Sequence, residues 1–300
     1  MKKILIVGGT GFIGYHLIKY LKKKNFNLFS ISTKKPKKKR RIKKVTYLIK
    51  NISKKNDIKS IKEKFDYIIN LGGYVDHSNK KLTYNSHYIG CMNLVKYLKN
   101  AKIKSFIQVG SSLEYGKIRS PQREDKKTFK TYSIYSRSKL LATRYLMKEY
   151  KLKNYPVIIL RGYQIYGPNQ DNNRLISSVI FNCFKNKFFS CSSGEQSRDF
   201  LYIDDFIRAI YKALNNDKAI GNIINIGSGN PIKVKKVILL IQKMIKKGKP
   251  NFGKINLRKD ELKILYPSIS KAFKILKWKP RIKFENGLKK TILYYRKIIK

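Results

Sequence analysis

Tyr135 and Lys139 are the two residues whose types and spacing best suit proton transfer in this sequence. They lie four positions apart in a stretch with a helical pattern, Tyr132 to Tyr150, so both side chains are expected on one helix face. A phenol titrates near pH ~10 in isolation, and a neighbouring ammonium lowers that pKa by stabilising the phenolate. The pair is therefore expected to exchange a proton with an alcohol or a carbonyl. Because the chain has 21 tyrosines and 69 lysines and arginines, chance pairs with this spacing also occur.

Ser111 and Ser112 are the second group of residues that could take part in a reaction. They follow Gly110 directly after a predicted buried strand, Ser105 to Val109. Ligands of parallel α/β folds bind at the carboxyl ends of the strands. A serine hydroxyl there is placed to hydrogen-bond the same oxygen on which the tyrosine acts. The alternative interpretation is an ordinary Gly-Ser-Ser turn.

The segment that must hold a reacting ligand beside these groups is the start of the chain, MKKILIVGGTGFIG. Its aliphatic run Ile4 to Val7 predicts a strand buried on both faces. The glycines that follow allow a sharp turn, a close approach of the backbone to a ligand and tight packing of a helix on the sheet. The amides of the first helical turn then face a pyrophosphate. The spacing predicts a dinucleotide site rather than a simple turn, and its residues are Gly8, Gly11, Phe12, Ile13 and Gly14.

The end of the second predicted strand, Leu28 to Ile31, bears on which dinucleotide binds. An acidic residue at this place binds the ribose 2′-hydroxyl of NAD. This chain has Ser32, Thr33 and Lys34 there instead. Hydroxyl and ammonium groups bind a 2′-phosphate that a carboxylate repels. The cofactor is therefore expected to be NADP or NAD, with the missing acid favouring NADP.

Two further strand ends complete the predicted cofactor site. Asn51 and Ile52 close the strand Val45 to Ile49, where an adenine ring is expected to rest. Leu71 and Gly72 end the strand Tyr67 to Leu71, and the glycine lets the ligand pass close to the backbone.

Strands and helices alternate regularly through the first half of the chain. The strand Val157 to Leu160 follows those above, and the predicted helices are Phe12–Lys24, Lys80–Asn100 and Tyr132–Tyr150. This alternation predicts an α/β fold with a doubly wound parallel sheet of the Rossmann type, in a dinucleotide-binding domain over residues 1–167.

The character of the chain changes after Gly167 and Pro168. A polar loop at 169–173 and a loop at 191–197 separate helices, and no second glycine-rich phosphate loop follows. Residues 168–300 are expected to form mainly a smaller substrate lobe, partly interleaved with the first. Its predicted elements are the helices Leu175–Phe184, Ile203–Leu214, Pro231–Lys247 and Glu285–Ile299, and the strand Ile223–Ile226.

Charge is the unusual feature of the composition. The 300 residues carry a formal net charge of +52, which attracts phosphorylated ligands, anionic lipid or nucleic acid. Lysines are spread over the whole length, and only 34–44 forms a dense basic block. That block is expected to be a solvated loop, since no nucleic-acid-binding motif accompanies it.

Three cysteines and three histidines without metal-ligand spacing predict no metal site and a reducing compartment. No apolar run reaches the ~18 residues of a membrane span, and no cleavable signal peptide is visible. A cytoplasmic protein is expected.

The motifs in their order resemble those of extended short-chain dehydrogenases/reductases, in the nucleotide-sugar epimerase/dehydratase group. The resemblance covers nearly the whole chain. It is carried by GGTGFIG (8–14), INLGG (69–73), GSSLEYG (110–116), YSRSK (135–139), LRGYQIYGPNQ (160–170), RDFLYIDD (198–205) and NIGSG (225–229).

The resemblance implies a role for each candidate residue. Tyr135 is the acid/base, Lys139 lowers its pKa and holds the nicotinamide ribose, and Ser111, with Ser112 next, orients the reacting oxygen. The substrate is a nucleotide sugar, and the residues assigned to it are Gln164, Arg174 and Arg198, the last gripping the diphosphate. Family members usually pair through two helices, so a homodimer through 80–100 and 132–150 is implied.

Differences from the family pattern reduce the number of activities that are expected. Dehydratases carry acidic residues directly after the active-site hydroxyl, where this chain has Ser112 and Leu113, with Glu114 one place too far along. His87 and Gln164 stand where many members have asparagine. The run GSSLEYG (110–116) resembles that of 4-ketoreductases, and the missing acid at Ser32 also favours a reductase. The expected activity is therefore hydride transfer at a sugar ring carbon, C4, of the 4-ketoreductase type. A 4-epimerase with tightly bound NAD is the alternative, and a non-catalytic NADP-binding protein or a basic RNA-binding protein is a third.

Overall fold

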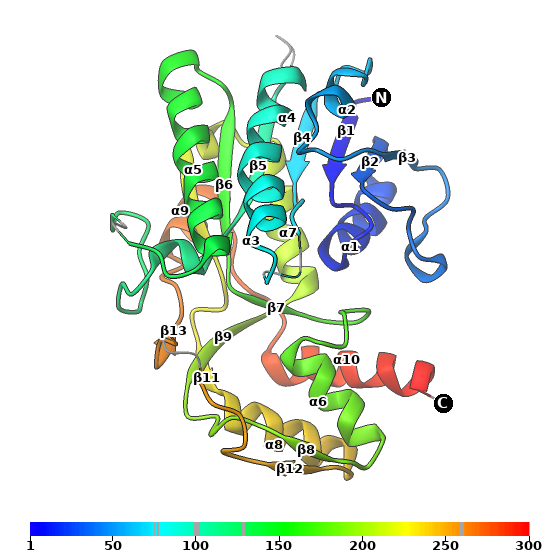
Figure 1. Cartoon of the computed structure of the whole chain (residues 1–300), viewed down its shortest axis with the longest axis vertical. Coiled ribbons are helices and arrows are strands. Elements are labelled where there is room, and N and C mark those ends of the chain that lie inside the picture. Colours follow the sequence, from blue (N-terminus) through cyan, green and yellow to red (C-terminus); the bar gives the residue numbers. More distant parts are fainter. Residues whose placement is uncertain (75, 77, 99–102, 128–129, 258–260, 300) are drawn as a thin grey trace.

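A parallel sheet of seven strands forms the upper lobe in Figure 1. The computed structural model describes residues 1–74, 76, 78–98, 103–127, 130–257 and 261–299. The strand order is β10-β6-β5-β4-β1-β2-β3, and each neighbouring pair is parallel. This confirms the predicted doubly wound sheet. The strands are β1 (Lys3–Val7), β2 (Asn27–Ser32), β3 (Thr46–Ile49), β4 (Tyr67–Asn70), β5 (Ser105–Ser111), β6 (Val157–Gly162) and β10 (Asn222–Ile226).

Helices cover both faces of this sheet, because alternate residues of each strand point to opposite sides. Ile4 and Ile6 of β1 belong to the same apolar cluster as Leu17 and Ile18 of α1 (Phe12–Leu21) and residues of α7 (Ile203–Leu214). The residues between them, Leu5 and Val7, pack with the helices on the other face, α4 (Gly90–Leu98) and α5 (Ile134–Lys153). Among the residues that the structure describes, no helix is long and apolar enough to cross a lipid bilayer.

The smaller lobe is built around β9 (Ser197–Tyr202), which pairs with three short strands: β7 (Gln164–Tyr166), β11 (Pro231–Lys233) and β13 (Ile264–Leu265). A second pair joins β8 (Phe188–Ser190) and β12 (Lys249–Asn251). The helices α6 (Leu175–Phe184), α8 (Val234–Ile245) and α10 (Phe284–Ile299) lie below the junction in Figure 1. Because β10 returns to the large sheet, the two lobes are interleaved along the chain. The boundary at residue 167 stays a prediction.

Two predicted helices differ most from the observed elements. The helix expected at 231–247 begins at Val234, because Pro231–Lys233 pairs with β9 as strand β11. The helix expected at 80–100 is divided into α3 (Lys80–Tyr84), a π-helical turn (Asn85–Ile89) and α4, and its last two residues, Lys99 and Asn100, lie outside the described residues. Short π-helical turns are frequent at functional sites.

The basic block forms the loop between β2 and β3, and one of its residues joins the lobes. Arg40 is buried, and its Nη2 donates to the Asn169 carbonyl at 2.6 Å and to an Asp171 carboxylate oxygen at 2.9 Å. His16 Nε2, on α1, lies 2.8 Å from the carbonyl oxygen of Pro168. Most of the block is solvated as expected, but Arg40 instead holds the segment that leads into the smaller lobe.

Candidate active site

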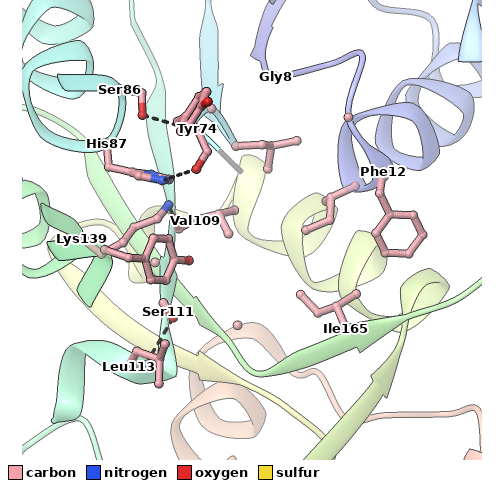
Figure 2. A pocket seen from close by; sticks show the side chains of 18 of the residues that line it. Gly8, Phe12, Tyr74, Ser86, His87, Val109, Ser111, Leu113, Lys139 and Ile165 are labelled. Carbon is pink, nitrogen blue, oxygen red and sulfur yellow. Dashed lines mark hydrogen bonds between the residues drawn. The ribbon is translucent and has the colours of Figure 1, made fainter. Parts of the chain in front are cut away.

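A cleft of about 810 Å³ lies at the carboxyl ends of the sheet strands and is bounded by both lobes. This volume is within the range of small-molecule sites. Figure 2 shows Gly8 and Phe12 on one wall and His87, Lys139 and Ser111 on the other. Lys34 does not line the cleft. The predicted site residues that do are Gly8, Gly11, Phe12, Ile13, Gly14, Ser32, Thr33, Asn51, Ile52, Leu71, Gly72, Ser111, Ser112, Tyr135, Lys139, Gln164, Arg174 and Arg198.

The glycine-rich turn has the shape that a dinucleotide pyrophosphate requires. Gly8 has φ of +81°, a left-handed conformation that favours glycine. A Cβ on Gly14 would lie 2.3 Å from the Gly8 carbonyl oxygen, so only glycine lets α1 start this close to β1. Gly11 is the N-cap of α1, and no side chain caps that helix end. The amides of the first turn therefore suit a phosphate, and the turn fits a dinucleotide.

Ser111 and Tyr135 meet at the opposite wall. Ser111 is the last residue of β5, and its Oγ accepts a hydrogen bond from the Leu113 amide at 3.2 Å. Tyr135 lies in the first turn of α5, with its ring edge-on to His87 at 5.0 Å between ring centroids. A hydrogen bond joins the tyrosine and the serine side chains. The two groups thus converge on one place, where a substrate oxygen can contact both.

The pKa of Tyr135 departs from the sequence-based expectation. Burial raises it above the ordinary value, and this outweighs the lowering by the hydrogen bond to Ser111 and by the Arg174 charge. The expected lowering by Lys139 is not found, and the Lys139 ammonium instead donates to the Val109 carbonyl oxygen at 2.8 Å. A raised pKa leaves the phenol protonated at neutral pH.

Lys139 is a buried cation. Its side chain is 4% exposed, and burial lowers its pKa to about 8, against the opposing effects of Glu114 and Cys91. The hydrogen bond to Val109 orients the ammonium along the cleft wall (Figure 2). The lysine is therefore held at the end of β5, one helical turn from Tyr135.

The depressed pKa of Lys139 predicts a pH dependence of stability. The unfolded chain binds this proton more tightly than the folded chain, so folding is favoured as pH rises from about 8 toward 10.5. The free energy of unfolding of wild type relative to Lys139→Met should increase by about 2 kcal/mol between pH ~7.5 and ~9.5. Urea unfolding of both proteins without added ligand measures it. An unchanged difference would show that the pKa is not depressed.

Glu114 lies next to the site but faces away from the cleft. Its side chain is fully buried and accepts hydrogen bonds from the Ser111 amide at 2.7 Å and from Thr143 Oγ1 at 2.8 Å. The Arg161 guanidinium pairs with it at 3.0 Å and lies over the Tyr115 ring. Glu114 does not line the cleft, so it positions Ser111 and is not placed to act on a bound ligand.

His87 occupies the cleft wall within the π-helical turn. Its Nε2 lies 3.3 Å from the Tyr74 carbonyl oxygen, and a Cβ on Gly73 would lie 1.8 Å from its Cε1. Glycine at position 73 therefore makes room for the His87 imidazole. The ring packs against Tyr135 and restricts the orientation of the phenol.

Two arginines line the cleft on the side of the smaller lobe, together with Asp171 and Glu261. Gln164 begins β7, and Arg174 is the exposed N-cap residue of α6. Arg198 on β9 is 6% exposed, and its guanidinium is hydrogen-bonded to the carboxylate of Glu261, which also lines the cleft. A ligand diphosphate that binds Arg198 must therefore share or replace this partner.

Several cleft residues are absent from the sequence-based prediction, among them Lys50, Ser53, Tyr74 and Glu261. Lys50 directly follows β3, and the rule that strand ends face the ligand would have found it. Glu261 reaches the cleft through the pairing of β13 with β9, which no local pattern indicates.

The fold and the cleft define a doubly wound α/β protein with a glycine-rich turn and a tyrosine–lysine pair lining one cleft. The chain belongs to the NAD dependent epimerase/dehydratase family, whose sequence profile matches residues 4–227. This confirms the resemblance to extended short-chain dehydrogenases/reductases.

Two curated relatives are about one third identical to the chain over the matched stretches. A UDP-glucuronate 4-epimerase of Thermodesulfobacterium geofontis is 32% identical over 69% of this chain and 64% of its own length. A dTDP-D-glucose 4,6-dehydratase of Dictyostelium discoideum is 34% identical over 76% of this chain and 58% of its own length. The chain thus spans less than two thirds of either protein.

A solved structure matches over nearly the full length. The UDP-glucuronic acid 4-epimerase of Bacillus cereus, in complex with UDP-glucuronic acid and NAD, is 26% identical and covers 99% of each chain with a TM-score of 0.89. Its fold is that of the present chain, including both lobes.

Proposed function

We propose that this protein is a nucleotide-sugar oxidoreductase that transfers a hydride at a sugar ring carbon, C4, as a 4-ketoreductase. The convergence of Ser111, Tyr135 and Lys139 on one wall of the cleft carries the proposal. The glycine-rich turn at the other wall suits a dinucleotide. A sugar bound between the walls would contact both the dinucleotide and these three side chains.

A nicotinamide dinucleotide, when bound, supplies the hydride for the sugar carbonyl. Tyr135 donates its phenolic proton to the oxygen as negative charge develops there. Ser111 orients that oxygen by a hydrogen bond, and the Lys139 ammonium, one helical turn away on α5, would stabilise the phenolate that remains.

The basic residues of the smaller lobe suit a nucleotide diphosphate. Arg174 and Arg198 line the cleft away from the glycine turn. A guanidinium binds two phosphate oxygens at once, so these residues are proposed to hold the diphosphate and Gln164 the sugar. The net charge of +52 also favours binding of such an anionic substrate.

The residues after Ser111 argue against dehydration. Ser112 and Leu113 line the cleft, but neither is acidic. The adjacent carboxylate, Glu114, is fully buried in its pair with Arg161. Elimination of water needs an acid beside the sugar, and the described residues at this place provide none.

A 4-epimerase is the second candidate, favoured by the identity to the UDP-glucuronate 4-epimerase. Incubation with 4-keto and 4-hydroxy nucleotide sugars, followed by absorbance of the reduced cofactor, separates the two. Stoichiometric oxidation of added NADPH by a 4-keto sugar is expected for the reductase. Interconversion of two 4-hydroxy sugars without net cofactor consumption would identify the epimerase, and no reaction with either class would overturn both.

A further inference from the structure

One short segment, residues 168–171, lies between the two halves of the cleft. It follows β7 and leads toward α6. Gln170 and Asp171 of this segment line the cleft, and so does Arg174, the N-cap residue of α6. A contact that fixes the segment therefore also fixes the side of the cleft that is proposed to hold the diphosphate.

Arg40 holds this segment from the larger lobe. Its Nη2 donates to the Asn169 carbonyl oxygen at 2.6 Å and to an Asp171 carboxylate oxygen at 2.9 Å. The Asp171 carbonyl oxygen in turn accepts from the Arg174 amide at 3.1 Å and from Ser177 Oγ at 2.7 Å. The contacts thus run from Arg40 through Asp171 to the start of α6 and Arg174.

The loop that carries Arg40 begins in the half of the cleft that suits the dinucleotide. Ser32 ends β2 and Thr33 follows it, and both line the cleft. Further along the same loop, Arg40 contacts the segment of the other lobe. A dinucleotide that rests against the start of the loop restricts its conformations, and this favours the one in which Arg40 holds Asp171.

His16 provides a second attachment that also begins beside the dinucleotide. Its Nε2 lies 2.8 Å from the Pro168 carbonyl oxygen. Its ring packs edge-on against Phe12, at 5.4 Å between ring centroids. Phe12 lines the cleft in the first turn of α1, close to Gly8 (Figure 2). Two separate elements of the larger lobe, α1 and the β2–β3 loop, therefore connect the dinucleotide side to the segment 168–171.

The contact between Arg40 and Asp171 is of moderate stability. The Arg40 side chain is 6% exposed, whereas that of Asp171 is 47% exposed. In the part of the chain that the structure describes, the buried Nε of Arg40 has no hydrogen-bond partner. Burying a guanidinium without all of its partners costs free energy. A ligand that orders the loop can therefore shift the fraction of molecules in which the contact is formed.

We propose that Arg40 is a positioning residue that makes the two ligands of the cleft bind cooperatively. A bound dinucleotide favours the contact between Arg40 and Asp171, and this contact holds Arg174 in place for the nucleotide diphosphate. The inference rests on the proposed function, which supplies the two ligands. Each ligand then raises the affinity for the other by the same factor, because coupling between binding equilibria is reciprocal.

Isothermal titration calorimetry of the full chain measures this coupling factor without turnover. UDP, dTDP, CDP and GDP are titrated first alone and then with NADP⁺ or NAD⁺ at saturation. Wild type should bind its preferred nucleoside diphosphate about tenfold more tightly when the dinucleotide is present. Arg40→Met should reduce this factor to about twofold or less, because methionine cannot hold Asp171. Asp171→Ala, at the half-exposed end of the contact, should lower the factor in the same way and serves as the test if Arg40→Met does not fold.

The neighbouring arginine separates this contact from general attraction by the +52 charge. Arg41 lies in the same loop, is exposed and does not line the cleft, so Arg41→Met should leave the coupling factor unchanged. Thermal unfolding checks that each variant is folded. A coupling factor of one in wild type, or an unchanged factor in the folded Arg40 or Asp171 variant, overturns this inference alone. If no nucleoside diphosphate and no dinucleotide binds, the proposed function fails together with the inference.

Discussion

Replacing Tyr135 with phenylalanine is expected to lower turnover by about 10³-fold while dinucleotide binding stays within about twofold. The phenol is the group in contact with Ser111 that can protonate the sugar oxygen, and phenylalanine cannot. The ring itself is retained, so its edge-on packing at 5.0 Å from His87 is preserved. Single-turnover oxidation of reduced cofactor in the presence of a 4-keto nucleotide sugar measures the chemical step directly.

A second tyrosine of the same helix provides the control. Tyr145 lies on α5 outside the cleft, so Tyr145→Phe should retain turnover within about twofold. Thermal unfolding of both variants checks that the fold is intact. Retention of more than a tenth of the turnover by Tyr135→Phe would exclude its phenol as the proton donor.

The large lobe can be predicted from local sequence, because each of its motifs lies within a short stretch of the chain. An aliphatic run followed by Gly8 predicts β1 and its turn without knowledge of any distant residue. The same rule, that ligands meet the ends of parallel strands, predicts Asn51, Gly72 and Ser111, all of which line the cleft.

The smaller lobe is harder to predict from local sequence, because its short strands form only by pairing with a strand that is distant in the sequence. β11 and β13 have three and two residues, too few for a periodic pattern, and both exist by pairing with β9. The predicted helix from Pro231 was wrong at its start for this reason. Glu261, beside β13, was missed as a cleft residue for the same reason.

Electrostatic properties also depend on contacts that spacing does not define. The four-residue spacing of Tyr135 and Lys139 predicts that they share a helix face, and both line the cleft. It does not show that the Val109 carbonyl holds the ammonium, nor that burial raises the pKa of the phenol. Lys34 and Lys50 both follow strands, in lysine-rich stretches, and the sequence alone does not distinguish them. Only the folded arrangement of β2 and β3 shows that Lys50 lines the cleft and Lys34 does not. The homodimer and the cytoplasmic location stay predictions.

Glu114→Gln is expected to lower the free energy of unfolding by about 3 kcal/mol. The substitution leaves the Arg161 guanidinium, 4% exposed, without its charged partner at 3.0 Å. It also weakens the acceptor for the Ser111 amide, so the active-site serine loses part of its support. Urea unfolding followed by fluorescence of the single tryptophan, which is Trp278, measures the change.

Two controls separate this positioning role from direct catalysis. Thr143→Val removes only the 2.8 Å hydrogen bond to Glu114 and should cost about 1 kcal/mol. In the double variant Glu114→Gln with Arg161→Met, the total loss should be smaller than the sum of the single losses, because the two charges compensate each other. If Glu114→Gln instead abolishes turnover while stability is unchanged, the carboxylate takes part in the reaction and elimination chemistry becomes possible again. Since the side chain is fully buried beneath Ser111, we expect the loss in stability and a smaller effect on turnover than in Tyr135→Phe.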